Sequence, residues 1–446
     1  MSPYVSLDLG YTARIIDGTS IVVRNQDDQA VAALSPLESV TVGLLDGRRN
    51  ESTVLECLQL LAGNTGLISA QNCLKRLDPV LRRTKRPEMR AMPGLEELVG
   101  VQVPDRRMGL RTLPGPRVLH WWVTNACPRR CVYCFANPDH TGQTEDGIIS
   151  RERLREIFEE ADSLGAEQLL VAGGEPFLRK DLPEILGDAI NSGLQPLATT
   201  KFPINENIAY RLRAAGMRHL CLSVDSINAE TNQNLVGSSA IGPQLNASVA
   251  ALKSAGIEFS FEFVATSINH QELEEVAQWS ADSGARVLLV VPFEPVLHLI
   301  GRYTNEQMLL PEDSNLLGRI ERLNDQHLEL SVEAFEDIGS KPAAPHCDIG
   351  KTKLFFDPFG RVHRCYKLLK DKTLFGPDLR KVSVAAAWHS DEFNSRLLAS
   401  KKKYSKATCG TCGAFQSCHD DGRCIFKSKL DHGTYFDRDR SCRGPY

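Results

Sequence analysis

Short apolar runs alternate with helical apolar stripes through the middle of the chain. Leu154, Ile157, Phe158 and Ala161 form one such stripe, with Ser150 placed to cap its helix. Strands are predicted at residues 118–123, 168–172, 195–199, 219–224, 257–264 and 287–291. This alternation predicts an α/β fold with a parallel sheet and outer helices. Right-handed crossovers would close the sheet towards a barrel, with the site at the C-terminal ends of its strands.

The first 86 residues have a different pattern. Apolar runs at 13–16 and 20–24 flank Asp17-Gly18-Thr19, which indicates a β-hairpin, and residues 31–34 predict a third strand. Ser35 and Pro36 then mark the start of a helix. Two more helices are predicted from about residue 51 to 61 and from about 69 to 81. We therefore expect a small domain of three strands and three helices.

The remaining boundaries follow from composition. Residues 87–116 contain five prolines among charged residues, which predicts a linker. The expected domains are residues 1–86, an α/β domain at 117–310, and a bridging segment with a cysteine-rich region at 311–446. Within the α/β domain, Asn269 is expected to cap the helix that carries Leu273 and Val276.

Composition narrows the possible partners. The 446 residues carry a net charge of −4, which does not indicate a nucleic acid partner. The N-terminus lacks the pattern of a secretory signal, and the strongly apolar stretch 287–293 is too short to span a membrane. We therefore expect a cytoplasmic protein with no membrane contact. Thirteen cysteines in such a chain favour metal or redox chemistry over disulfides.

Three closely spaced cysteines follow the first predicted strand. Cys127, Cys131 and Cys134 have the spacing C-x3-C-x2-C. Three thiolates on one tight loop can hold three irons of a [4Fe–4S] cluster and leave the fourth iron open to a small chelating molecule. The alternative is a zinc site or buried thiols, but structural zinc needs a fourth ligand.

The cysteine spacing resembles the signature of the radical S-adenosylmethionine (SAM) enzymes, which have a six-stranded partial (β/α)6 barrel. After the second predicted strand, a turn similar to the family's GGEP motif is formed by Gly173, Gly174, Glu175 and Pro176. The resemblance implies that this turn binds the methionine amino group of SAM. Without it, the same residues would be an ordinary strand-to-helix turn.

The resemblance implies further SAM contacts. Ser223 and Asp225 would bind the ribose hydroxyls and the carboxylate region, although a helix cap or turn is the alternative reading. Tyr133 would lie beside the adenine. Many relatives have an arginine before a glycine after the fourth strand, whereas the stretch 234–237 reads Asn-Leu-Val-Gly in this chain.

The C-terminal region is similar to the SPASM extension of radical SAM peptide modifiers, which binds two auxiliary [4Fe–4S] clusters. The resemblance implies that the first is held by Cys347, Cys365 and Cys424, and the second by Cys409, Cys412, Cys418 and Cys442. An Asp-Pro-Phe-Gly turn at 357–360 predicts a hairpin that brings Cys347 and Cys365 together. Lys341 stands where some relatives have an extra cysteine. Two zinc sites are the competing reading.

The N-terminal domain is similar to the peptide-binding, winged-helix-like PqqD module of pyrroloquinoline quinone synthesis. The phrase Leu-Leu-Asp-Gly at 44–47 is the most telling part of this likeness. The resemblance implies that the domain binds the leader of a precursor peptide as an added strand. An unrelated winged-helix domain or a dimerisation module is the alternative.

Together these resemblances imply a radical SAM enzyme with SAM and three [4Fe–4S] clusters, reduced by a donor such as flavodoxin or ferredoxin. A 5′-deoxyadenosyl radical would take a hydrogen from a ribosomal precursor peptide, leading to an oxidative carbon–carbon or thioether cross-link. The same parts serve in enzymes that convert a sulfatase residue to formylglycine. A non-catalytic zinc and peptide scaffold is the third hypothesis. The sequence does not identify a catalytic base.

Overall fold

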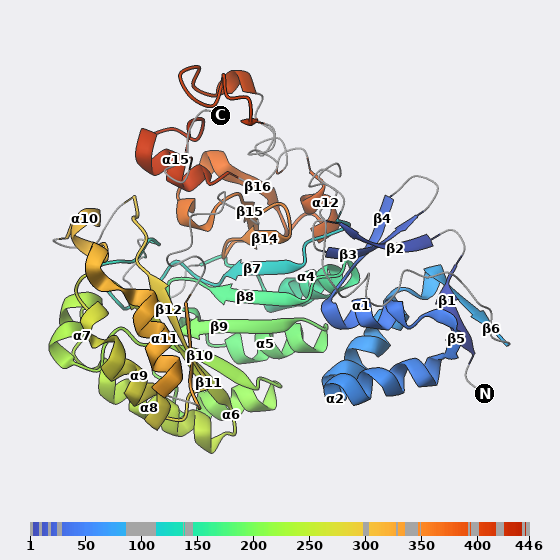
Figure 1. The fold of residues 1–446 in the computed structure, drawn as a ribbon, viewed down its shortest axis with the longest axis horizontal. Coiled ribbons are helices and arrows are strands. Elements are labelled where there is room, and N and C mark those ends of the chain that lie inside the picture. The colour runs from blue at the N-terminus through green and yellow to red at the C-terminus, as the bar shows by residue number, and fades with distance from the viewer. Residues whose placement is uncertain are drawn as a thin grey trace.

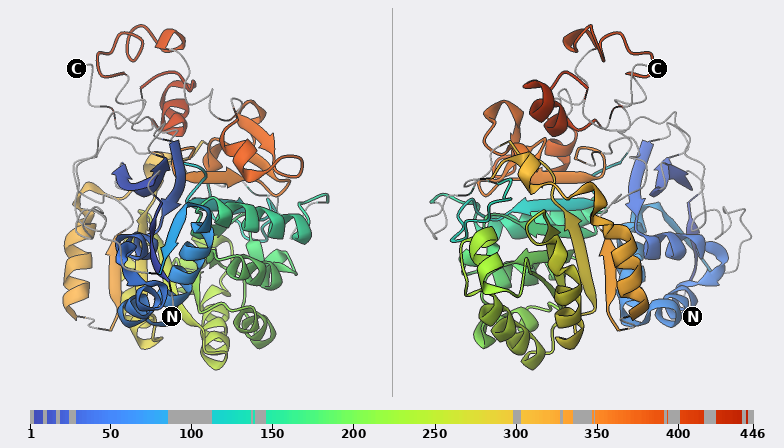
Figure 2. Two further views of the ribbon diagram at one scale, coloured as in Figure 1. Left: turned by 90° about the vertical axis from the view of Figure 1, so that its right-hand side faces the viewer. Right: turned by 60° about the vertical axis from the view of Figure 1, so that its left-hand side comes forward.

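A ten-stranded sheet lies at the centre of the computed structural model (Figure 1). The structure describes residues 3–8, 11–16, 19–24, 29–85, 113–136, 138, 146–297, 303–326, 329–334, 347, 349–390, 393, 401–415, 423–438 and 442. The N-terminal domain lies beside this sheet, and the C-terminal region lies at the top of the molecule in both views of Figure 2.

The order of the central sheet is β13-β12-β11-β10-β9-β8-β7-β14-β15-β16. Its strands are β7 (Val118–Trp122), β8 (Gln168–Ala172), β9 (Gln195–Thr200), β10 (His219–Ser223), β11 (Glu258–Ala265), β12 (Val287–Pro292), β13 (Ser331–Ala334), β14 (Lys353–Phe356), β15 (Arg361–His363) and β16 (Phe375–Asp378). Strands β7 to β13 are parallel, and the six predicted strands are confirmed to within one residue at each end. The α/β class with a parallel sheet is therefore confirmed.

Two pairings extend the sheet beyond the six predicted strands. β13 pairs with β12, so the parallel sheet continues past residue 310. On the other side β14 pairs in parallel with β7, and β15 and β16 follow as antiparallel strands. The C-terminal region thus shares one sheet with the α/β domain.

Helices connect the parallel strands. They are α4 (Arg151–Ser163), α5 (Leu182–Asn191), α6 (Glu206–Ala214), α7 (Ala229–Val236), α8 (Ile241–Ser254), α9 (Leu273–Asp282), α10 (Asn305–Met308) and α11 (Leu316–Gln326). The predicted cap of α4 is confirmed, since the Ser150 side chain accepts a hydrogen bond from the Arg153 backbone nitrogen. The predicted apolar stripe of α4 is buried, which fixes this helix against the sheet.

The sheet and its helices enclose one large apolar core. Trp121, Phe261 and Phe263 are fully buried in it. The same core includes Phe355 of β14 and Trp388 of α12 (Val384–Trp388), both from the C-terminal region. The C-terminal hairpin is therefore packed as part of the central domain.

The N-terminal domain has a separate apolar core. Its first sheet is antiparallel in the order β2 (Tyr11–Ile16), β3 (Thr19–Arg24) and β4 (Gln29–Leu34). Helix α1 (Pro36–Gly43) starts at a capping box formed by Ser35 and Glu38. The predicted hairpin, third strand and helix start are confirmed. A second sheet, which the sequence analysis missed, pairs β1 (Tyr4–Leu7) with β5 (Asp46–Asn50) and β6 (Leu81–Thr84).

The prediction of two separate helices after α1 is wrong. One helix, α2 (Glu51–Arg76), runs through the whole region. Gly63 and Gly66 lower its helix propensity by about 1 kcal/mol each, but neither breaks a helix as proline does. Leu58 and Leu74, on either side of the glycines, are buried in the N-terminal core and hold both halves on one helix. The described part of this domain has two α-helices, and its likeness to a winged helix stays a prediction.

The short 3-10 helices are η1 (Asp78–Val80), η2 (Pro176–Leu178), η3 (His270–Glu272), η4 (Glu312–Ser314), η5 (Tyr366–Leu368), η6 (Lys372–Leu374) and η7 (Lys401–Lys403). One further helix, α15 (Ile425–His432), belongs to the cysteine-rich region. Within the described ranges, no helix is both long enough and apolar enough to cross a membrane.

Candidate functional site

The loop with Cys127, Cys131 and Cys134 follows the C-terminal end of β7. Its backbone is held by the end of α7, since the Val132 nitrogen donates to the Leu235 carbonyl oxygen at 2.8 Å. Gly237 ends α7 in a left-handed conformation with φ +74°. The stretch 234–237, which lacks the arginine of many relatives, thus anchors the cysteine loop through its backbone.

The three thiols of this loop lie close together. Burial raises the pKa of the Cys127 thiol to about 11, with a smaller contribution from Cys134. Burial also raises the pKa of Cys131, and both neighbouring cysteines add to the shift. Coordinated iron would reverse this preference for the neutral thiol, because a metal cation stabilises the thiolate. None of the cysteines in the described ranges forms a disulfide.

The described side chains do not provide the ligand set of a single metal ion. Among the described residues, no three His, Cys, Asp or Glu side chains form a group that could hold a single ion. A [4Fe–4S] cluster distributes its thiolates over separate irons, so its sulfur ligands lie further apart than those of one tetrahedral zinc. Cys127, Cys131 and Cys134 supply three thiols for such a cluster.

The turn at 173–176 packs directly on the start of the cysteine loop. The Gly174 nitrogen donates to the Thr124 carbonyl at 2.7 Å, and the Glu175 nitrogen donates to the Ala126 carbonyl at 2.8 Å. A Cβ atom on Gly174 would lie only 2.2 Å from the Ala126 oxygen. Position 174 therefore requires glycine, and its close approach brings Glu175 beside Cys127.

The Glu175 carboxylate is buried at this turn. It accepts hydrogen bonds from the Thr200 hydroxyl at 2.6 Å, the Phe177 nitrogen at 3.1 Å and the Lys201 nitrogen at 3.2 Å. Burial raises its pKa in spite of these three donors. A ligand ammonium group would stabilise the carboxylate form, so this site fits the amino group of SAM.

Tyr133 and Asp225, predicted to contact SAM, meet directly. The Tyr133 hydroxyl donates to Asp225 Oδ1 at 2.6 Å, and Lys201 Nζ lies 3.2 Å from Oδ2. Asn269 Nδ2 donates to the Asp225 backbone oxygen at 2.8 Å. The expectation that Asn269 caps a helix is therefore wrong: its side-chain oxygen accepts from Thr266, and the whole side chain fixes the turn at Asp225.

Sequence reasoning missed two charged residues at this site. Lys201 follows β9, and Glu262 lies opposite Ser223 in the pairing of β10 with β11. Burial lowers the pKa of the Lys201 ammonium, but Asp225 and Glu262 raise it, and the net shift is upward. Burial raises the pKa of Glu262. The sequence could have indicated Lys201 as a site residue, because it stands at the C-terminal end of a predicted parallel strand, where such folds place their sites.

The predicted turn between β14 and β15 is confirmed. Asp357 accepts hydrogen bonds from the backbone nitrogens of Phe359 and Arg361, both at 2.9 Å, and Gly360 has φ +79°. Cys365 follows β15. Burial raises the pKa of its thiol, and the neighbouring thiols of Cys347 and Cys424 raise it further. The structure thus groups Cys347, Cys365 and Cys424.

Cys424 is the N-cap residue of α15. The Lys427 backbone nitrogen donates to its sulfur at 3.4 Å. The N-terminal end of a helix carries a partial positive charge that favours a thiolate. This position therefore suits a cysteine that ligates a cluster.

The other C-terminal cysteines are described only in part. Cys409 and Cys412 share a turn in which the Cys412 nitrogen donates to the Cys409 carbonyl at 3.3 Å. Cys409 packs with Tyr404, Phe415 and Phe436. Cys418 lies outside the described residues, as does Lys341. A four-cysteine site that includes Cys418 and Cys442 stays a prediction.

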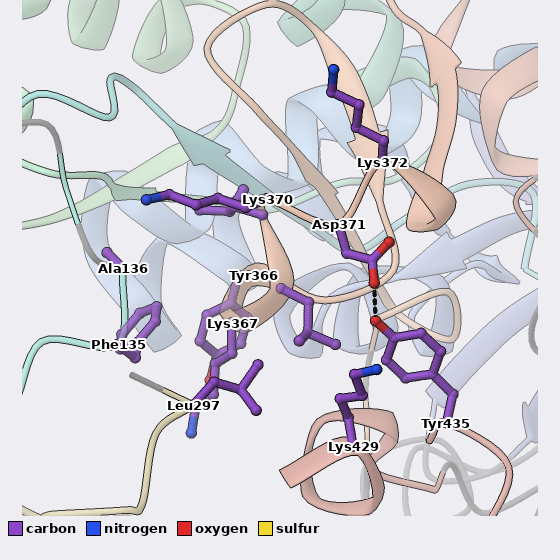
Figure 3. Close-up of a pocket in the computed structure, with 12 residues that line it drawn as sticks. Phe135, Ala136, Leu297, Tyr366, Lys367, Lys370, Asp371, Lys372, Lys429 and Tyr435 are labelled. Carbon is purple, nitrogen blue, oxygen red and sulfur yellow. Dashed lines mark hydrogen bonds between the residues drawn. The ribbon is translucent and has the colours of Figure 1, made fainter. Parts of the chain in front are cut away.

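A cavity of about 500 Å³ is lined by residues that directly follow Cys134 and Cys365 (Figure 3). Phe135 and Ala136, which directly follow Cys134, form one part of its wall. Tyr366, which directly follows Cys365, continues this wall, because its ring lies 5.4 Å from the ring of Phe135 in an edge-to-face contact. The remaining lining residues are Leu297, Lys367, Leu368, Leu369, Lys370, Asp371, Lys372, Lys429 and Tyr435. A molecule bound here would contact residues next in sequence to Cys134 and to Cys365.

Two family models match this chain. Residues 122–280 match the radical SAM superfamily, and residues 347–413 match SPASM, an iron–sulfur cluster-binding domain. The chain therefore contains a radical SAM domain followed by a SPASM domain. These domains imply SAM and [4Fe–4S] clusters as cofactors, and they support an enzymatic function.

Individual relatives are distant but cover most of the chain. An AdoMet-dependent heme synthase of Methanosarcina barkeri is 23% identical over 73% of this chain and 96% of its own length. The mycofactocin maturase MftC of Mycobacterium tuberculosis is 25% identical over 71% and 80%. SuiB of Streptococcus suis, solved with SAM, has a similar fold with a TM-score of 0.60, 14% identity and coverage of 98% and 100%.

Replacing Gly174 with alanine is expected to lower SAM cleavage at least about tenfold. The added methyl group would collide with the Ala126 carbonyl, and overpacking of this kind costs about 1–3 kcal/mol and displaces the turn from the cysteine loop. The measurement is anaerobic formation of 5′-deoxyadenosine. Gly242→Ala is the matched control, because a Cβ there meets only ordinary contacts. Equal rates in the two variants would contradict the role of this close approach.

Proposed function

We propose that this chain is a radical SAM enzyme that modifies a ribosomally synthesised precursor peptide. The observation that carries the proposal is the cavity whose wall includes both Phe135, the residue after Cys134, and Tyr366, the residue after Cys365. Substrate held there would be close to the radical-generating site and to an auxiliary cluster. MftC, a maturase, and SuiB, solved with its precursor peptide SuiA at a TM-score of 0.59, support a peptide as substrate.

In this proposal the loop after β7 holds the SAM-binding cluster through Cys127, Cys131 and Cys134. Glu175 receives the methionine ammonium group, because its carboxylate is buried among three hydrogen-bond donors and its pKa stays raised in spite of them, so that an ammonium group would stabilise its charged form. When bound, the cluster and SAM supply a radical that abstracts a hydrogen atom from the peptide.

Asp225 is the chain's best group for the ribose hydroxyls. Asn269 fixes its backbone, and Tyr133 and Lys201 fix its carboxylate, so the side chain is held in one position before SAM binds. Ser223, the last residue of β10, stands two residues before Asp225 and adds a hydroxyl to this site.

The C-terminal cysteines complete the proposal. Cys347, Cys365 and Cys424 would hold the first auxiliary cluster, and Cys409, Cys412, Cys418 and Cys442 the second, giving three clusters per chain. Formation of a carbon–carbon or thioether cross-link removes two hydrogen atoms from the peptide. An auxiliary cluster would accept the second electron, and flavodoxin or ferredoxin would supply the electron that starts each turnover.

The test is anaerobic incubation of the reconstituted protein with SAM, a reductant and the short peptide encoded beside its gene. A product lighter by two hydrogen atoms, together with 5′-deoxyadenosine, is the expected result. Zinc instead of iron and sulfide in the C-terminal region after reconstitution would favour a peptide-binding scaffold.

The N-terminal domain is proposed to bind the leader of the precursor. In the sheet formed by β2, β3 and β4, the two edge strands are β2 and β4. An edge strand offers unpaired backbone groups to an added strand. The domain has its own apolar core, which suits an independent binding unit.

Deleting residues 1–86 is expected to suppress peptide modification but to leave uncoupled SAM cleavage. The separated domain should bind the leader with a Kd in the micromolar range, or about −8 kcal/mol. Calorimetry on residues 1–86 and product analysis on residues 87–446 measure the two effects. Modification of the full precursor at the normal rate by the shortened enzyme would refute the leader role.

A further inference from the structure

We propose that the cavity beside Tyr366 binds a carboxylate of the substrate peptide, either an acidic side chain or the C-terminal carboxylate. The inference rests on the proposed function, because it takes the ligand to be part of a peptide. Among the described residues, four lysines line this cavity, against one carboxylate, that of Asp371. Three of the four follow Cys365 in sequence, and Lys429 comes from α15.

Asp371 is engaged in holding the wall of the cavity. Its carboxylate accepts from the Thr373 nitrogen at 2.9 Å and from the Thr373 hydroxyl at 2.6 Å. The Tyr435 hydroxyl donates to the other oxygen, as the dashed line in Figure 3 shows. Burial raises the pKa of Asp371, but these donors and Lys429 lower it, and the net shift is downward. Asp371 is therefore an anion whose oxygens are already hydrogen-bonded.

The four lysines have different surroundings. Lys367 forms an ion pair with Glu294, and Glu294 also lies 3.6 Å from Lys427. The charge of Lys367 is therefore balanced by a carboxylate of the protein itself. Lys370 and Lys372 are exposed, and in Figure 3 Lys372 extends away from Asp371. Lys370, from the segment after Cys365, and Lys429, from α15, supply the other ammonium groups of the lining.

Lys429 is only partly exposed. Its Nζ atom donates to the Gly433 carbonyl at 2.8 Å and lies 5.1 Å from the centre of the Tyr435 ring. An ammonium group has three donors, so one hydrogen bond to a carbonyl leaves capacity for an anion. A fixed, partly desolvated cation of this kind interacts more strongly with a carboxylate than one on an open surface does.

The rest of the lining is apolar and aromatic. Phe135 and Tyr366 form one wall, and Leu297 adds an aliphatic surface. A cavity with an apolar wall and a cationic side selects a carboxylate next to an apolar or aromatic group. Because Phe135 and Tyr366 directly follow Cys134 and Cys365, a carboxylate fixed by the lysines would hold the neighbouring peptide residue beside the chain segments that carry these two cysteines.

Three N-acetylated pentapeptides test this inference on the reconstituted full chain. The first is Gly-Tyr-Gly-Glu-Gly with an amidated end, the second is Gly-Tyr-Gly-Gln-Gly with a free C-terminal carboxylate, and the third is the second with an amidated end. Affinities are measured anaerobically by calorimetry. At least one acidic peptide should bind about three- to tenfold more tightly than the neutral one. The first peptide reports an acidic side chain, and the second reports the chain end.

The variants are Lys370→Gln and Lys429→Gln, alone and combined, with Lys253→Gln on the exposed side of α8 as the control. The double variant should lose the preference for the acidic peptide, whereas Lys253→Gln should keep it. Iron content and thermal unfolding establish that the double variant is folded. Equal affinity for all three peptides, or a preference that survives the double variant, would overturn the inference. Failure of the proposed function would show separately, as a precursor that is never modified while the carboxylate preference persists.

Discussion

Replacing Cys127, Cys131 and Cys134 together with alanine is expected to abolish SAM cleavage and to lower the iron content by about a third. The proposed three clusters correspond to about twelve irons per chain, and the triple variant removes the ligands of one cluster. Its effect should be complete, because Glu175 and Asp225 can orient SAM but carry no redox chemistry. Iron analysis and anaerobic assay of 5′-deoxyadenosine measure the two effects.

Cys57→Ala is the control for this triple variant. Cys57 lies on α2, far along the chain from both cysteine groups, and is only partly buried. This variant should keep its full iron content and its SAM cleavage. If the triple variant still produced 5′-deoxyadenosine at the normal rate, the loop after β7 would not hold the SAM-binding cluster.

Replacing Cys424 with alanine is expected to separate the two products. Cross-linked peptide should disappear while 5′-deoxyadenosine still forms, because hydrogen abstraction depends on the loop at Cys127 and not on the group at Cys365. The loss should be large, since Cys424 is one of three grouped thiols and its sulfur accepts the hydrogen bond at the start of α15. Both products are measured in one reaction by mass spectrometry.

The control for Cys424→Ala is Asp431→Ala, an exposed position on the same helix. It tests whether a change in α15 alone lowers the yield. Normal yield of cross-linked peptide in Cys424→Ala would show that this cysteine is not on the electron path. The assignment of the first auxiliary cluster would then be wrong.

Local patterns predicted the central elements well. The six strands and the cap at Ser150 depend on short-range periodicity and on turn residues, which the sequence contains directly. The turn at Gly174 was also found locally, but the reason for its glycine was not, because the Ala126 oxygen that approaches it comes from the preceding strand's loop. Close contacts between neighbouring strands are not visible in one stretch of sequence.

The features that the sequence analysis predicted wrongly or missed also depend on contacts between distant parts of the chain. Asn269 has the residue type of a helix cap, but its side chain forms hydrogen bonds with the Asp225 carbonyl and with Thr266. Helix α2 continues through two glycines because residues on both sides pack in the N-terminal core. Lys201 pairs with Asp225 and comes near the charge of Glu262 only after β9, β10 and β11 align. In each case a tertiary contact decided the outcome over the local preference.

The pairing of β14 with β7 has a consequence for folding. Residues 353–356 supply backbone partners to residues 118–121, and their side chains enter the same core, so neither segment is complete without the other. The α/β domain and the first part of the SPASM domain should therefore unfold as one cooperative unit, and the amides of both strands should exchange with solvent at similar rates. A chain that ended at residue 310 would leave β7 without this neighbour and would expose an apolar strand prone to aggregation.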